Sequence, residues 1–232
     1  MGNKVYAILL AAGSGSRMGS RVTKQMMMLG NQTVLQRTLG AFDRCDMVDG
    51  IILVCRADEV SAVREQVSLY PRKVLDIIPG GATRAMSARI GFEAVSRSCD
   101  FVAIHDVARC LIRPEEIDAV IREAISVGAA GAACLVFDTL KVVDSNSNIV
   151  STIDRSTIRC AMTPQVFSCE LYSRGLEACR SFDGITDDNM LMEAIGVSVR
   201  AVEVGRENVK ITTTDDLNYA EYVLSKRGEL NV

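Results

Sequence analysis

The sequence has 232 residues, of which 48% are hydrophobic and 24% are charged, and its formal net charge is −3. This is the composition of an ordinary globular protein, and the length suits a single α/β domain over residues 1–232. The slightly acidic balance provides no basic field for nucleic acid, so an anionic substrate would need a local cluster of cations. No apolar run reaches the roughly 18 residues of a membrane span, so no membrane association is predicted.

The elements expected along the chain begin with the apolar run VYAILLA (5–11), which two nearby glycines follow. This pattern favours a buried first strand over a signal peptide. Similar runs rich in Val and Ile predict further strands at 50–55, 73–79, 101–106 and 129–137. Helical patterns lie between the strands at 33–44, 58–69, 84–97 and 114–127.

This alternation of strands and helices predicts an α/β fold with a single doubly wound, mostly parallel sheet of Rossmann-like type. Ligands of such sheets bind beyond the carboxyl ends of the strands. The segments 11–15 and 105–109 follow two predicted strands, so we expect them to lie together on one rim of the sheet.

The stretch from about 138 to 163 interrupts the alternation with polar and apolar residues around the turn-rich SNSN. It predicts a β-hairpin, or arm, that projects from the core. Because an isolated hairpin is marginal in water, we expect this arm to pack on a second copy of the chain. A flexible excursion loop is the alternative.

The eight cysteines include no C-x-x-C pair, and most lie in apolar runs such as IILVC and AACLVF. Buried free thiols in a reducing compartment are the favoured interpretation, so we expect a cytoplasmic protein. His105 is the only histidine, which argues against a Cys/His zinc site.

The first candidate binding segment is LLAAGSGSRMGSRVTKQ (9–25), in which a glycine-rich loop follows a strand. Small residues allow backbone N–H groups to approach phosphate oxygens closely. Arg17 and Lys24 follow and can neutralise a triphosphate. The segment lacks the GK[ST] of a Walker loop and the third glycine of the dinucleotide fingerprint.

This loop, L-x-A-G-x-G-x-R-M followed by K-Q, resembles the signature loop of sugar-phosphate nucleotidyltransferases. The further segments GGATRAMS (80–87), IHDVAR (104–109) and DTLK (138–141) resemble those of the 2-C-methyl-D-erythritol 4-phosphate cytidylyltransferase family. Three more match in order, namely DRSTIRCAMTPQVF (154–167), TDD (186–188) and ENVKITTTDDL (207–217). The resemblance therefore extends over nearly the whole chain.

The resemblance implies that a phosphate monoester attacks the α-phosphorus of CTP and displaces pyrophosphate, with Mg²⁺ as cofactor. Two anions must meet, so positioning and charge stabilisation dominate such a transfer. By this match Arg17 and Lys24 hold the triphosphate, and Lys210 lies beside the α-phosphate. Arg155 lies at the end of the arm and acts in trans in a homodimer that exchanges arms.

The resemblance also implies residues that bind each substrate. Asp106 orients the sugar-alcohol phosphate or helps to place Mg²⁺. The nucleotide-binding positions are Ala11, Ala12, Gly13, Gly15, Gly81, Ala82 and Ser87. The remaining substrate-binding positions are Arg109, Thr139, Thr163 and Thr186. A capping role for Asp106 and an ordinary surface role for Arg155 are the structural alternatives.

Several other positions are not given a catalytic or binding side-chain role. His105 is expected to be structural, because the attacking phosphate is already an oxyanion and needs no general base. Ala82 and Cys110 depart from the acidic residue and the proline that the family usually has there. Cys110 is read as a small buried hydrophobe. Asp215 and Asp216 are expected to cap a final helix.

Two other functions remain open at this point. A ribitol 5-phosphate cytidylyltransferase would share the same core and mechanism. A non-catalytic CTP-binding regulator would need a degenerate site, for which Ala82 and Cys110 are the only indications. The presence of Arg17, Lys24, Asp106, Arg155 and Lys210 argues for an enzyme.

Overall fold

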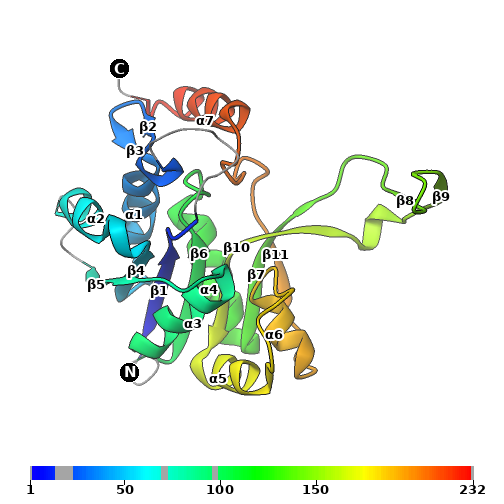
Figure 1. The fold of residues 1–232 in the computed structure, drawn as a ribbon, viewed down its shortest axis with the longest axis horizontal. Coiled ribbons are helices and arrows are strands. Elements are labelled where there is room, and N and C mark those ends of the chain that lie inside the picture. Colours follow the sequence, from blue (N-terminus) through cyan, green and yellow to red (C-terminus); the bar gives the residue numbers. More distant parts are fainter. Residues whose placement is uncertain (1, 14–22, 69–72, 96–98, 231–232) are drawn as a thin grey trace.

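The computed structural model of the chain describes residues 2–13, 23–68, 73–95 and 99–230. At its centre lies a seven-stranded sheet with the strand order β11-β7-β10-β6-β1-β4-β5 (Figure 1). The strands are β1 Val5–Leu10, β4 Gly50–Cys55, β5 Val74–Pro79, β6 Phe101–Asp106, β7 Ala129–Leu135, β10 Arg159–Ser168 and β11 Arg200–Glu203.

All neighbouring strands are parallel except β10, which runs antiparallel to both β6 and β7. The five strands predicted from apolar runs are present within two residues of the expected bounds. The antiparallel β10 and the short edge strand β11 were not predicted as strands. The doubly wound, mostly parallel α/β fold is confirmed.

Helices cover both faces of this sheet (Figure 1). One face carries α1 Val34–Arg44, α2 Val60–Val67, α4 Pro114–Val127 and α7 Thr214–Lys226. The other carries α3 Arg84–Val95, α5 Cys169–Ala178 and α6 Asn189–Ala194. Short elements of the described residues include β2 Met28–Leu29, β3 Gln32–Thr33 and the 3-10 turns η2 Lys24–Met26, η3 Ala57–Glu59 and η4 Arg155–Thr157.

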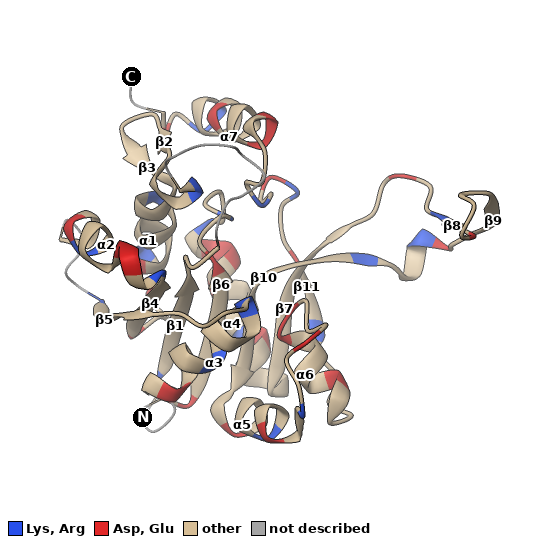
Figure 2. Cartoon of the chain, in the orientation of Figure 1, with Lys and Arg blue, Asp and Glu red and all other residues tan. Residues whose placement is uncertain are grey.

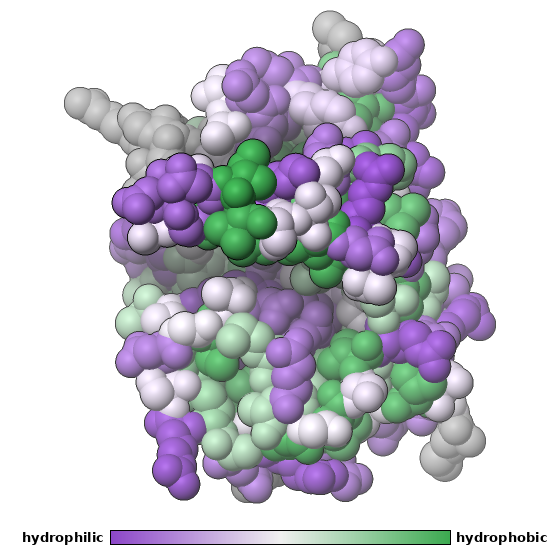
Figure 3. All heavy atoms as spheres, turned by 90° about the vertical axis from the view of Figure 1, so that its right-hand side faces the viewer, coloured by the Kyte–Doolittle hydropathy of each residue, from purple (hydrophilic) through white to green (hydrophobic). Residues whose placement is uncertain are grey.

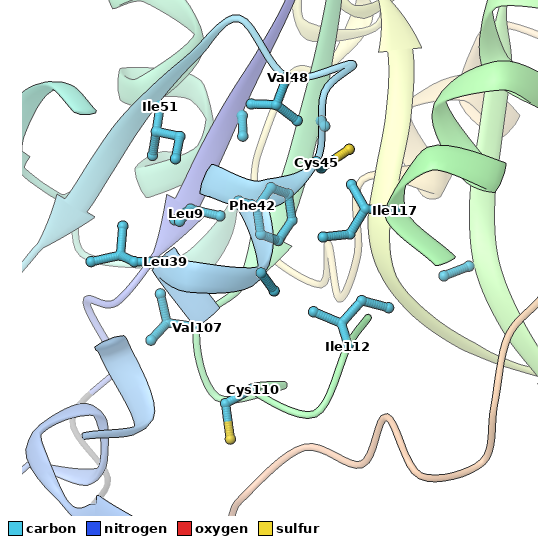
Figure 4. Close-up of a cluster of buried hydrophobic side chains, with 14 of the residues drawn as sticks. Leu9, Leu39, Phe42, Cys45, Val48, Ile51, Val107, Cys110, Ile112 and Ile117 are labelled. Carbon is cyan, nitrogen blue, oxygen red and sulfur yellow. The ribbon is translucent and has the colours of Figure 1, made fainter. Parts of the chain in front are cut away.

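The alternation of side chains along a strand produces one core on each face. In β1, Ala7 and Leu9 join the first core, whereas Tyr6 and Ile8 join the second. Figure 4 shows Phe42 of α1 among the side chains of the first core. Because both faces of β1 are buried, its sequence is apolar throughout, as a covered parallel strand requires.

Local signals fix where the helices start and end. Thr33 caps α1 in a capping box with Gln36. Pro114 opens α4, and Gly128 ends it with a φ of 92°, a left-handed conformation that favours glycine. In α7 the capping residue is Thr213, and the Asp216 carboxylate accepts hydrogen bonds from Thr212 and Thr213, which confirms the expected capping role of Asp216.

Beyond β7 the chain leaves the core and forms an extended arm (Figure 1). Its tip is a two-stranded antiparallel hairpin of β8 Lys141–Val143 and β9 Ile149–Thr152. Apolar side chains at this tip are exposed, namely Val142, Val143, Ile149, Val150 and Ile153. Figure 3 views the molecule from the side on which the arm projects, and apolar surface lies there among polar residues. Within the described ranges, no helix has the length and apolarity needed to span a bilayer.

Candidate active site

A cavity of about 340 Å³ lies beyond the carboxyl ends of β1 and β6. This is the edge at which parallel α/β sheets bind ligands. Segments far apart in sequence line it, including Ala11–Gly13 after β1, Gly81–Arg84 at the start of α3, and Asp106 at the end of β6. The charged residues that line it are Lys24, Arg84, Asp106 and Lys210.

Lys24 reaches the cavity from the 3-10 turn that follows the glycine-rich loop. Its ammonium nitrogen lies 3.8 Å from the place where a side chain at Gly13 would put its Cβ. A side chain at this position would therefore contact Lys24, whereas glycine leaves the backbone open to a ligand. This arrangement brings a cation and accessible backbone together at the end of β1.

Asp106 lies between two cations. Its Oδ2 accepts a hydrogen bond from Lys210 Nζ at 2.6 Å, and its Oδ1 accepts one from Arg84 Nε at 2.8 Å. Burial alone would raise the pKa of the Asp106 carboxyl, but Arg84 and Lys210 outweigh burial and hold that pKa well below its usual range. The carboxylate is therefore ionised at neutral pH and fixes both cations at the floor of the cavity.

A second carboxylate extends this arrangement away from the cavity. Arg84 Nη1 donates to Asp188 Oδ2 at 2.6 Å, and the Tyr172 hydroxyl donates to Asp188 Oδ1 at 2.7 Å. Asp188 and Tyr172 are buried. Burial and the adjacent Asp188 carboxylate raise the pKa of Tyr172 well above its ordinary value, so this residue remains a hydrogen-bond donor.

His105 belongs to a buried hydrogen-bond chain behind Asp106. Its Nδ1 lies 3.0 Å from Thr163 Oγ1, and its Nε2 lies 3.3 Å from the carbonyl oxygen of Arg109. The backbone N–H of Asp106 donates to the same Thr163 oxygen at 3.1 Å. Burial lowers the pKa of His105 to about 3, so the ring is neutral and structural, as the sequence predicted. A carbonyl can only accept, so Nε2 donates to Arg109, and Nδ1 accepts from Thr163.

The turn before α3 packs closely against the loop after β1. A Cβ at Gly80 would lie 2.7 Å from Ser87 Oγ and 3.0 Å from Ala12 Cβ. The backbone N–H of Gly81 donates to Ser87 Oγ at 3.1 Å. Glycine is therefore required for this close approach, and Ser87, which also lines the cavity, holds the turn through its hydroxyl.

The structure brings many of the sequence-predicted positions to this cavity, namely Ala11, Ala12, Gly13, Lys24, Gly81, Ala82, Ser87, Asp106 and Lys210. Gly15 and Arg17 lie outside the described residues. Thr163 is buried behind Asp106, and Arg109 donates to the Asn208 carbonyl at 2.9 Å without lining the cavity.

The three remaining predicted positions are exposed and do not line the cavity. Thr186 hydrogen-bonds to the Met190 sulfur. Thr139 lies at the base of the arm, and Arg155 donates to the Phe137 carbonyl there. One chain therefore assembles the cavity-lining positions, whereas Arg155 belongs to η4 of the arm that projects from the core (Figure 1).

Sequence reasoning assigned no role to Arg84, Asp188 and Gln25. Arg84 is the arginine of the quoted GGATRAMS segment, and Asp188 ends the quoted TDD, so both lay within recognised motifs. Their partners are 22 and 104 residues away along the chain, and the spacing alone gave no reason to pair them. Gln25 lines the cavity and donates to Glu59 Oε2 at 2.7 Å, which ties the turn of Lys24 to η3.

A magnesium ion can be tested against this donor set. Within the described ranges, no three carboxylate, histidine or cysteine side chains gather into a metal-binding group. Asp106 is the one carboxylate lining the cavity among the described residues, and Lys210 and Arg84 each contact one of its oxygens. Mg²⁺ is commonly held by one or two carboxylates together with substrate phosphates and water. The residues therefore fit an ion that arrives with a triphosphate.

Charged residues of both signs are spread over the molecule (Figure 2). The cavity therefore owes its positive character to the local lysines and arginine described above. This arrangement suits a bound polyphosphate better than an extended nucleic acid, which needs a continuous basic surface.

The sequence of this chain matches a known protein family over nearly its whole length. Residues 5–226 match the model of the family described as 2-C-methyl-D-erythritol 4-phosphate cytidylyltransferase. The enzyme of that name from Desulforamulus reducens is 37% identical over 233 residues, covering 98% of each chain. The one from Lachnospira eligens is 40% identical over 220 residues, covering 92% of this chain and 96% of its own.

Solved structures agree with these matches. The 4-diphosphocytidyl-2C-methyl-D-erythritol synthase of Anaerococcus prevotii superposes with a TM-score of 0.85 at 28% identity, covering 97% of this chain and all of its own. The 2-C-methyl-D-erythritol 4-phosphate cytidylyltransferase of Francisella tularensis superposes with a TM-score of 0.78 at 27% identity, covering 94% of this chain and 99% of its own.

Proposed function

This chain belongs to the 2-C-methyl-D-erythritol 4-phosphate cytidylyltransferase family, and we propose that its cavity joins CTP to 2-C-methyl-D-erythritol 4-phosphate. The products are 4-diphosphocytidyl-2-C-methyl-D-erythritol and pyrophosphate, and the reaction belongs to the non-mevalonate route to isoprenoid precursors. The observation that carries this proposal is the meeting of Lys24, Asp106 and Lys210 in one cavity from three distant segments.

In the reaction a phosphate oxygen of the acceptor forms a bond to the α-phosphorus of CTP. The bond between the α-phosphorus and the bridging oxygen to the β-phosphate breaks, and the electron pair leaves with pyrophosphate. Both reactants are anions, so cations must lower their repulsion and stabilise the charge of the transition state. Lys24 and Lys210 line the cavity, which supports assigning this role to them, and we assign Arg17 to the same triphosphate.

Asp106 would orient Lys210 and take part in holding Mg²⁺ with the phosphates of CTP. Magnesium would neutralise charge on the triphosphate and make pyrophosphate a better leaving group. No general base is needed, because a phosphate monoester is largely ionised near neutral pH. The neutral, buried His105 is consistent with this chemistry.

Recognition of the base is assigned to the wall formed by Gly81, Ala82 and Ser87. Ala82 lines the cavity, and Ser87 holds the Gly80–Gly81 turn in place. A pyrimidine fits beside small residues, and backbone groups can read its edge. Because Ala82 offers only a methyl group, any contact at this position would come from its backbone.

The acceptor phosphate is assigned to Arg155 of a second copy of the chain, in a homodimer that exchanges arms. Arg155 is exposed on the arm, and the apolar tip of that arm is uncovered in one chain. Covering this tip with a second copy would remove apolar surface from water. The proposal extends to Arg109, Thr139, Thr163 and Thr186 as residues that contact or position the acceptor.

We place this chemistry in the cytoplasm. All eight cysteines are free thiols, including the close pair Cys99 and Cys169. Free thiols of this number are typical of a reducing compartment.

The test of the substrate is pyrophosphate release from CTP and Mg²⁺, with 2-C-methyl-D-erythritol 4-phosphate and ribitol 5-phosphate supplied in parallel. Turnover with the first alone supports the proposal. Turnover with ribitol 5-phosphate alone would keep the mechanism and replace the acceptor. Binding of CTP without turnover of either acceptor would support a regulator instead.

The trans assignment has its own test, because two inactive variants should complement each other. Lys24→Ala and Arg155→Ala are each expected to be inactive as homodimers. In a mixed dimer, the Arg155→Ala chain keeps its Lys24 and receives an intact Arg155 from its partner, so one working site forms. Mixing should therefore restore activity at one of the two sites of each mixed dimer. If Arg155 acts in its own chain, mixing restores nothing.

A further inference from the structure

The buried ion pairs around Arg84 have no role in the reaction as described so far. Arg84 opens α3, and its guanidinium contacts two carboxylates that come from separate segments of the chain. One is Asp106 at the end of β6, which also holds Lys210. The other is Asp188, just before α6. The resulting chain of contacts is Tyr172–Asp188–Arg84–Asp106–Lys210.

These contacts depend on the planar shape of the Arg84 guanidinium. Nε donates to Asp106 at 2.8 Å while Nη1 donates to Asp188 at 2.6 Å, so two nitrogens of one rigid plane fix two carboxylates. The Asp106 oxygen that faces Arg84 differs from the one that faces Lys210. Arg84 therefore determines how the carboxylate is rotated and which oxygen is presented to Lys210.

The end of this chain of contacts that is formed by Asp188 and Tyr172 is rigid. The Asp188 side chain is 1% exposed, and Tyr172 is fully buried against Phe92 and Phe167, with ring centroids 4.9 and 5.4 Å away. The Asp188 backbone N–H also donates to Gln165 Oε1 at 2.8 Å. This anchor stands in the core between the sheet and helices α3, α5 and α6, so it has little freedom to move.

We propose that Arg84 is a positioning residue of the transferase site, anchored by Asp188 and Tyr172, and that it acts by holding Asp106 in the rotation that places Lys210 at the α-phosphate. This inference rests on the proposed function. Arg84 would act on the rate indirectly, because it fixes Asp106 and Asp106 in turn fixes the Lys210 ammonium. Displacements of about 1 Å in such an arrangement can lower a rate on the order of 100-fold.

A purely structural ion pair is the alternative to this proposal. It would lower stability when removed but leave the kinetics of the folded fraction unchanged. The two interpretations differ in what they predict for variants that retain the fold, and these variants can be chosen at increasing distance from the cavity.

Three substitutions carry the test, namely Arg84→Lys, Asp188→Asn and Tyr172→Phe. Lysine keeps the charge but has one nitrogen, so it cannot donate to both carboxylates from the two positions that arginine occupies. Arg84→Lys is expected to lower kcat by roughly 100-fold while KM for CTP changes much less. Tyr172→Phe removes one hydroxyl far from the substrate and should lower kcat about threefold. The Asp188→Asn variant should fall between them.

A double variant tests whether Asp188 affects the rate through Arg84. If Asp188 acts through Arg84, the Arg84→Lys/Asp188→Asn double variant should be scarcely slower than Arg84→Lys alone. A purely structural role would not lower the kcat of the folded protein in any of these variants.

Matched controls are available for the arginine and the tyrosine substitutions. Arg89 lies on α3 and forms an exposed ion pair with Glu93, and Tyr222 is exposed on α7. Arg89→Lys and Tyr222→Phe should retain wild-type kcat. Thermal melting and circular dichroism give the folded fraction of every variant, and rates are divided by it.

The inference is overturned if folded Arg84→Lys and Tyr172→Phe keep wild-type kcat, or if the losses of Arg84→Lys and Asp188→Asn multiply in the double variant. Failure of the proposed function would look different. In that case the wild-type protein itself would release no pyrophosphate with the acceptor.

Discussion

Lys210 donates a hydrogen bond of 2.6 Å to Asp106 across 104 residues of sequence. The pair joins the end of β6 to the loop before α7, and it places the Lys210 ammonium at the cavity. The Lys210 side chain is 36% exposed, whereas the Asp106 side chain is 9% exposed. The carboxylate is thus the fixed partner, and the ammonium faces the space that substrates enter.

The first prediction concerns this ammonium. Lys210→Gln keeps a hydrogen-bond donor beside Asp106 but removes the positive charge. Because this charge opposes the developing charge at the α-phosphorus, kcat should fall on the order of 100- to 1,000-fold. Pyrophosphate release at saturating substrate measures the loss. Lys226→Gln, at the exposed end of α7, is the control and should retain full activity. A Lys210→Gln variant with near-normal kcat would remove Lys210 from the proposed mechanism.

The second prediction concerns the single histidine. The folded pKa of His105 is about 3 because the ring is buried, whereas an unfolded histidine titrates near 6.5. The native state therefore binds fewer protons than the unfolded state between these values. The free energy of unfolding should fall as pH decreases through this window, by up to about 1.4 kcal/mol per pH unit from this group, and the contribution should be constant above it.

Nuclear magnetic resonance can follow His105 directly, since its ring signals have no histidine neighbours to overlap with. In the folded protein the ring shifts should remain those of a neutral imidazole from pH 8 to pH 5. A midpoint near 6.5 in the native protein would contradict the burial and hydrogen bonding described for this side chain.

The third prediction concerns the apolar tip of the arm. Ile149 and Val150 are 68% and 64% exposed in one chain. If a second copy covers them, Val150→Asp should weaken the dimer by placing a charge in a desolvated contact. Sedimentation velocity should show a monomer at concentrations where the wild type is dimeric. Val127→Asp, exposed at the end of α4, provides the control and should leave the association state unchanged.

The fourth prediction concerns Cys110, which the sequence predicts to be a small buried hydrophobe. It belongs to the loop after β6 (Figure 4) and is 4% exposed, and burial raises its pKa to about 12. Since the thiolate is the reactive form, Cys110 should resist maleimide in the native protein and react only after unfolding. Exposed Cys160 should react first. Fast native labelling at Cys110, detected by peptide mass spectrometry, would be the contrary result.

The central sheet was predictable because its parallel strands are buried on both faces. The runs at 50–55 and 101–106 are apolar at nearly every position, and the structure places strands at both. The strand β10 escaped prediction for the opposite reason. Its first residues are exposed, its pairing with β7 shifts register between Ala161 and Gln165, and Pro164 lies inside it. Neither a simple alternation nor a continuous apolar run describes such a strand.

The candidate site likewise contains residues that the sequence predicted and residues that it did not. Lys24 follows directly from the glycine-rich loop, so local sequence was sufficient to propose it. The ion pairs of Arg84 with Asp106 and Asp188 depend on how α3, β6 and the segment before α6 converge. Residue spacing carries no information about such convergence, and only the folded arrangement shows that these charges meet.

The two outer strands of the sheet bear on how folded copies of this chain avoid aggregation. The sheet ends at β5 on one side and β11 on the other. Strand β5 carries Asp76 and ends at Pro79, which has no N–H to donate, and β11 has only four residues, with Arg200 and Glu203 at its ends. Charges, proline and short length are the features that keep a free sheet edge from accepting another strand. Growth of the sheet from molecule to molecule, as in a fibril, is therefore disfavoured at both edges.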